Sequence, residues 1–145
     1  MRIKINLNIK IGRVAKYLTL VDLMFFGGWG FIQPIFAVFV VEEVAGATIV
    51  TAGSLAAVYW IIKSVLQLPV ARLLDKTPGE KDDFYALISG LFLASIAAFL
   101  FVLVDQVWQL YAVQILYSVA MAFYAASWPA LFSRHLDKDE VSFDW

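Results

Sequence analysis

Six polar or amphipathic side chains interrupt the first two long apolar runs of this sequence, and they are its best candidates for chemistry. They form two stripes, one in each run: Asp22, Trp29 and Gln33, then Tyr59, Lys63 and Gln67. Within each stripe the spacing of four or seven residues places the side chains on one face of a helix. If these runs span a bilayer, a charge near its centre costs about 2.5–3.5 kcal/mol and needs a polar environment. We expect the two stripes to line one aqueous cavity, with Asp22 and Lys63 either paired or both in contact with a polar substrate.

Each of these charges also has a purely structural interpretation. Asp22 could be an interfacial carboxylate that caps the start of its helix. Lys63 could extend its ammonium group to the lipid headgroups. Gln114, in the fourth apolar run, is a further candidate for the path of a solute.

Other kinds of site are excluded by composition or lack partners. With no cysteine, the chain has no disulfide, no thiolate zinc ligand and no thiol nucleophile. His135 is the single histidine and cannot by itself build a His-based metal site or a proton relay. Ser127 and Ser133 have no nearby base, while Asp82 and Asp83 are expected in a solvated turn without convergent partners. We therefore expect no enzyme, no catalytic residue, no metal and no cofactor, and the net charge of −1 gives no field that favours nucleic acid.

The elements that must position the two stripes are long apolar helices. Of 145 residues, 62% are hydrophobic and 16% are charged, whereas soluble domains carry about 25% charged residues. A helix that spans a bilayer needs roughly 20 apolar residues, and four runs satisfy this length: 17–41, 46–74, 84–104 and 107–133. A basic segment, 1–16, precedes them and a polar tail, 134–145, follows. The predicted fold class is therefore an all-α integral membrane protein with four transmembrane helices.

Basic residues predict the orientation of these helices. The N-terminal segment, the turn after the second span and the tail all carry Lys or Arg, whereas the other two turns carry none. Because cytoplasmic segments retain basic residues, we expect both termini inside, in a multi-pass protein of the cell (inner or plasma) membrane. Residues 2–11 alternate between polar and apolar, which fits a strand or an interfacial segment, although a flexible basic anchor on anionic lipid is the favoured alternative.

Small residues predict where the helices pack. Close packing in lipid relies on small residues at four-residue spacing, and the third and fourth spans each carry such a ladder: Ala86, Gly90, Ala94 and Ala98, then Ser118, Ala122, Ala126 and Ala130. The two spans should therefore contact each other or equivalent neighbours closely, unless a high alanine content produces the ladders by chance. In the first span, three glycines precede a proline: Gly27, Gly28, Gly30 and Pro34. This combination predicts a hinge or a cavity-lining kink, with plain close packing as an equal alternative.

The turn after the second span carries a charged motif. Asp75 and Lys76 form its acidic and basic core, Ala71 stands four positions before Asp75, and Gly79 follows Pro78. In these residues the sequence resembles the signature of the major facilitator superfamily of secondary transporters, in which a Gly occupies the position of Ala71 and a second Gly lies one place nearer the core. The positions that correspond to the signature loop are these: Ala71, Arg72, Asp75, Lys76, Gly79 and Lys81.

The resemblance implies a fold and a function. The chain corresponds to the first four helices of the N-terminal six-helix half of such a transporter, and Gln114 sits where many members have an Arg. The implied function is a partial secondary transporter that moves a small solute by alternating access, with proton coupling as an option, and that is not competent alone. Its partners would be the lipid bilayer, the solute, and either a missing transporter half or further copies of itself. The alternative is a self-contained four-helix membrane protein, either a small multidrug-type dimeric transporter or a non-transporting scaffold.

Overall fold

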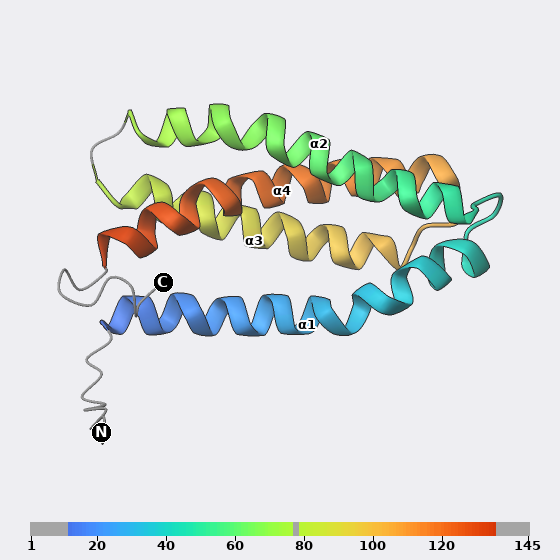
Figure 1. Ribbon diagram of the computed structural model, residues 1–145, viewed down its shortest axis with the longest axis horizontal. Coiled ribbons are helices and arrows are strands. Elements are labelled where there is room, and N and C mark those ends of the chain that lie inside the picture. The colour runs from blue at the N-terminus through green and yellow to red at the C-terminus, as the bar shows by residue number, and fades with distance from the viewer. Residues whose placement is uncertain (1–11, 77–78, 136–145) are drawn as a thin grey trace, which may run out of the picture.

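The computed structural model describes residues 12–76 and 79–135. It contains four helices, shown in Figure 1: α1 (Arg13–Glu43), α2 (Ile49–Leu74), α3 (Lys81–Phe101) and α4 (Val107–Arg134). All four are long and apolar enough to cross a membrane, so the all-α class with four spans is confirmed. Their bounds lie within four residues of the predicted spans. The alternating segment 2–11 and most of the polar tail, 136–145, lie outside the described residues.

Local hydrogen bonds explain where two of the helices begin. At the start of α2 the Thr48 side chain accepts from the Thr51 amide at 3.3 Å, and the Thr51 hydroxyl accepts from the Thr48 amide at 3.1 Å. At the start of α4 the Gln109 carboxamide oxygen accepts from the Asp105 and Gln106 amides at 2.9 and 3.1 Å. These bonds satisfy backbone donors that a helix start leaves free.

The fourth helix is the centre of the packing. It lies against α3 and α2 along most of their lengths, whereas α1 touches α2 and α4 at few places. Gly90 on α3 shows how close the α3–α4 contact is, because a Cβ atom there would lie 2.8 Å from the Ala120 carbonyl oxygen and 3.0 Å from the Tyr124 amide nitrogen. The predicted close contact between the third and fourth spans is therefore confirmed.

The glycines of α1 behave differently. A Cβ atom at Gly27, Gly28 or Gly30 would meet nothing within 4 Å. The prediction that they pack closely is therefore wrong for the four described helices. The helix stays continuous through Pro34, and Figure 1 shows it change direction in its second half.

The two ends of the bundle differ in charge. The start of α1, the α2–α3 connection and the end of α4 share one end, on the left in Figure 1, and basic residues flank all three. At the other end the two remaining connections meet, where the Ala45 amide donates to the Asp105 carbonyl at 3.1 Å. This segregation of Lys and Arg is the pattern on which the prediction of cytoplasmic termini rests.

Candidate functional site

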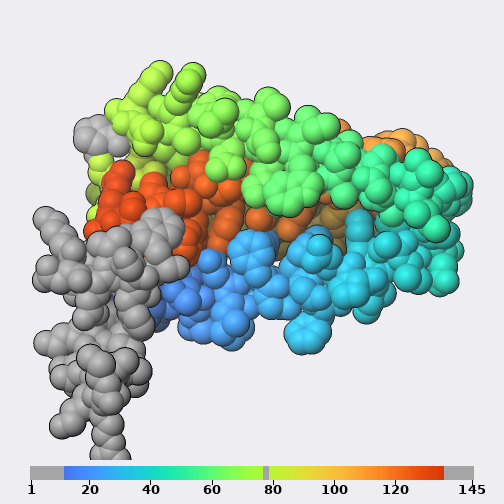
Figure 2. All heavy atoms as spheres, in the orientation of Figure 1, coloured from blue at the N-terminus to red at the C-terminus, as the bar shows by residue number. Residues whose placement is uncertain are grey.

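A cavity of about 440 Å³ lies between α1, α2 and α4. All of its lining residues belong to these three helices, and α3 packs behind α4 without reaching it. Figure 2 shows atoms of α4 in the gap between those of α1 and α2.

The structure brings five of the seven predicted path residues to this one cavity. The five come from three helices: Trp29, Gln33, Tyr59, Lys63 and Gln114. Gln67 lies beside them, because its side-chain amide donates to the Ala125 carbonyl at 3.4 Å and Ala125 lines the cavity. Asp22 does not line the cavity itself. It accepts a hydrogen bond from the hydroxyl of Tyr124, which does.

The position of Asp22 corrects two interpretations. Since α1 begins at Arg13 with Gly12 as its N-cap residue, Asp22 lies more than two turns inside the helix and does not cap it. Among residues 12–76 and 79–135 the ion pairs join Arg134 to Asp83 and His135 to Glu80. Of the two arrangements expected for Asp22 and Lys63, direct pairing is therefore wrong, and contact with a shared substrate stays a prediction. The carboxylate of Asp22 instead holds α1 to α4.

Lys63 presents its charge to the cavity wall. Its ammonium nitrogen lies 4.9 Å from the ring centroid of Trp60 and 5.7 Å from that of Tyr59. Aromatic faces attract cations electrostatically. Of the described lining residues, Lys63 alone carries a formal charge.

Three aromatic rings from three helices stack along the cavity. Trp29 and Tyr117 have centroids 4.8 Å apart at 17°, and Tyr117 and Tyr59 have centroids 5.7 Å apart at 28°. Tyr117 is thus the middle of the stack, yet sequence reasoning missed it and Tyr124. The available signal was their spacing from Gln114: intervals of three and ten residues keep all three side chains near one face of α4.

A second cavity, of about 460 Å³, lies between α1 and α3. Its lining side chains are apolar apart from the Trp29 indole. It therefore offers little to a polar solute.

The signature loop lies at the basic end of the bundle. Asp75 is the C-cap residue of α2, and its amide donates to the Ala71 carbonyl at 2.9 Å. The side chains of Asp75, Lys76 and Lys81 are exposed. Arg72, in the last turn of α2, is exposed as well. Gly79 has φ +139°, a backbone conformation that favours glycine.

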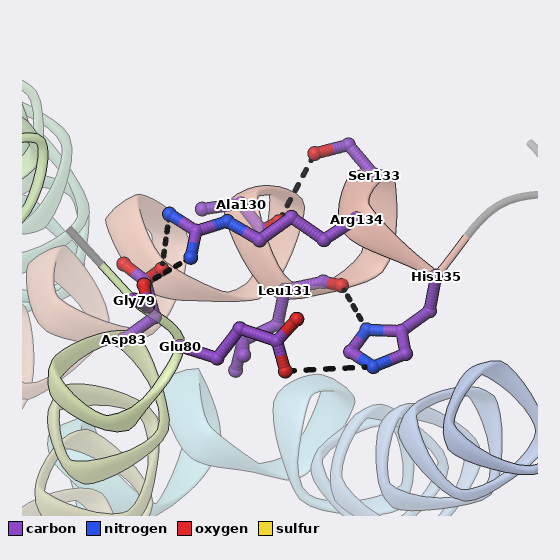
Figure 3. Close-up of polar contacts among 8 residues, drawn as sticks. All are labelled: Gly79, Glu80, Asp83, Ala130, Leu131, Ser133, Arg134 and His135. Carbon is purple, nitrogen blue, oxygen red and sulfur yellow. Dashed lines mark hydrogen bonds and ion pairs between the residues drawn. The ribbon is translucent and has the colours of Figure 1, made fainter.

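The end of α4 clasps this loop to α3. Arg134 pairs with the buried Asp83 carboxylate at 3.0 Å and donates to the Gly79 carbonyl. His135, the residue that follows α4, lies 3.6 Å from Glu80, and Figure 3 shows the side chains of Arg134 and His135 reaching toward the start of α3. The expectation that Asp83 lacks a convergent partner is therefore wrong. We call Arg134, Gly79 and Asp83 the α4–α3 clasp.

Comparison with known proteins places the chain in a family. A family model described as the Major Facilitator Superfamily matches residues 18–143. No curated protein and no solved structure matches the chain. Within the described residues, no group of three or more His, Cys, Asp or Glu side chains could hold a metal ion.

Proposed function

Because this chain belongs to the Major Facilitator Superfamily, whose members are membrane transporters, we propose that it forms part of a secondary transporter that moves a small solute by alternating access. The chain is a multi-pass membrane protein, and we assign it to the cell membrane. The cavity between α1, α2 and α4 is then one wall of the solute path.

The observation that carries this proposal is the placement of polar groups at membrane depth. A charge and two carboxamides, from Lys63, Gln33 and Gln114, converge on one cavity between helices that are otherwise apolar. Ionisable groups in transmembrane segments are costly and mark solute or ion pathways. Asp22, bonded to Tyr124 at the edge of this cavity, is the group to which proton coupling would be assigned.

Alternating access needs two helical units that rock around one site. The four helices described here supply one such unit, so the proposal includes a partner: a missing transporter half or a second copy of this chain. In a second form of this proposal, the transporter is a self-contained dimer of small multidrug type. The contrasting alternative is a scaffold that transports nothing.

Single cysteines test whether the cavity is an aqueous path. The natural chain has no cysteine, and two adjacent alanines of α2 make a matched pair: Ala56 lines the cavity, whereas Ala57 is exposed but does not. Thiols react as thiolates, which need water. We expect a charged methanethiosulfonate to label A56C in membrane vesicles at least about tenfold faster than A57C.

The same labelling separates the forms of the proposal. With the chain expressed alone, A56C should react from one side of the membrane, because the second rocking unit is missing. Reaction from both sides would favour a self-contained dimer. Equally slow reaction of A56C and A57C would leave no aqueous path and would favour the scaffold.

A further inference from the structure

We infer that the cavity between α1, α2 and α4 binds an organic anion with a planar apolar body. This inference rests on the proposed function, because it names the substrate class of that same cavity. Three features carry it: an unpaired cation, a stack of aromatic rings and two carboxamides.

The cation defines the charge of the solute. Lys63 is the one charged side chain among the described lining residues, and no carboxylate of the described chain pairs with it. The partner expected from the sequence, Asp22, accepts a hydrogen bond from Tyr124 instead. The faces of Trp60 and Tyr59 stabilise the ammonium only in part. A cation at membrane depth needs a polar environment or a partner, and a solute carboxylate or sulfonate supplies a partner of opposite charge.

The aromatic stack defines the shape of the solute. Trp29, Tyr117 and Tyr59 lie nearly parallel, at 17° and 28°. Tyr117 lies between the other two rings, so the outer rings, Trp29 and Tyr59, are the ones with a face that Tyr117 does not cover. All three line a cavity of about 440 Å³, within the usual size of small-molecule sites. Planar rings stack favourably on such faces, so a solute with one or two fused rings suits the site.

The remaining polar groups set the orientation. Gln33 and Gln114 reach the cavity from α1 and α4 and can donate and accept hydrogen bonds. Neither carries charge, so neither offsets Lys63. A cationic solute would be repelled by Lys63, and a neutral solute would leave its charge uncompensated.

Binding to the full chain in lipid nanodiscs tests the inference without requiring transport. The probes are 2-naphthoate, its neutral analogue 2-naphthamide and the cation 2-naphthylmethylammonium, measured by calorimetry against empty nanodiscs. We expect naphthoate to bind about tenfold more tightly than naphthamide and the cation not to bind. K63Q should abolish the preference for naphthoate, whereas K63R should keep it.

Three further variants guard against a merely structural effect. K16Q removes a lysine of α1 that is exposed outside the cavity, and it should leave all binding unchanged. W29L should weaken naphthoate and naphthamide to the same degree, because it removes an outer ring of the stack, while W29F, which keeps an aromatic ring, should weaken neither.

The outcomes separate this inference from the proposed function. Equal binding of the three probes, preference for the cation, or no binding of naphthoate overturns the inference even if A56C labels as an aqueous path. Naphthoate binding that depends on Lys63 supports it even if vesicle assays show no transport.

Discussion

The first and fourth helices have similar lengths, 31 and 28 residues, yet they are packed very differently. In its most apolar 18-residue window, 6% of α1 is buried, against 50% of α4. Yet α1 is the more apolar of the two.

Neighbours, and not hydropathy, explain this difference. In lipid there is little hydrophobic drive between helices, so burial requires a close-fitting partner. Within the described residues α4 has two, α2 and α3, whereas α1 touches α2 and α4 at only a few places. Lipid or helices other than these four must cover the glycine face of α1, formed by Gly27, Gly28 and Gly30.

The largest expected effect comes from filling the α3–α4 contact. G90L would force a side chain against the backbone of α4 at Ala120 and Tyr124, and we expect it to lower the free energy of unfolding by about 3 kcal/mol. G28L, on the open face of α1, should change it by less than about 0.5 kcal/mol. Unfolding in mixed micelles with increasing dodecyl sulfate, followed by circular dichroism, measures both.

If G28L lowered the free energy of unfolding as much as G90L, the contrast between a packed α4 and an open α1 would be wrong. This result would mean that the glycine face of α1 is packed in the membrane, against another copy of the chain.

A smaller effect is expected at the α4–α3 clasp. R134Q would leave the buried Asp83 carboxylate without its cation, which we expect to cost about 2 kcal/mol in the same unfolding experiment. R13Q, at the exposed start of α1, is the matched control and should have no measurable effect. The double variant R134Q/D83N should recover most of the loss, since it removes both charges together.

Failure of D83N to rescue R134Q would show that Arg134 stabilises the end of α4 through Gly79 alone. The different effects of R134Q and R13Q on the free energy of unfolding would then depend on the single contact of Arg134 with the Gly79 carbonyl.

The smallest effect concerns the bond that joins the two helices. Y124F removes the hydroxyl that donates to Asp22, and hydrogen bonds between transmembrane helices contribute about 0.6 kcal/mol on average. Y111F is the control, because it removes a bond from α4 to Ser54 of α2 and leaves α1 untouched.

Spin labels on Val38 of α1 and Ile115 of α4, both exposed, distinguish the two variants. We expect the distance distribution between the labels to broaden in Y124F and not in Y111F. Equal distributions in wild type and Y124F would show that α1 is held to α4 by other contacts.

Much of the candidate site could be predicted from spacing alone. The stripe Tyr59, Lys63 and Gln67 follows helical periodicity, which acts within one element. Tyr117 and Tyr124 were not predicted, because their role depends on facing α1 across the cavity. The ion pair of Asp83 was missed for the same reason, since its partner Arg134 lies 51 positions further along the chain.

By itself, the sequence determined the four spans, their polar stripes and the small-residue contact of α3 with α4. These depend on hydropathy and helical geometry, which are local properties of the chain. Only the tertiary structure decided that Asp22 bonds to Tyr124 rather than to Lys63, and that α4 is central while α1 is exposed. Apolar helices in lipid have many nearly equivalent neighbours and rotations, so their pairing is decided by side-chain fit between distant segments.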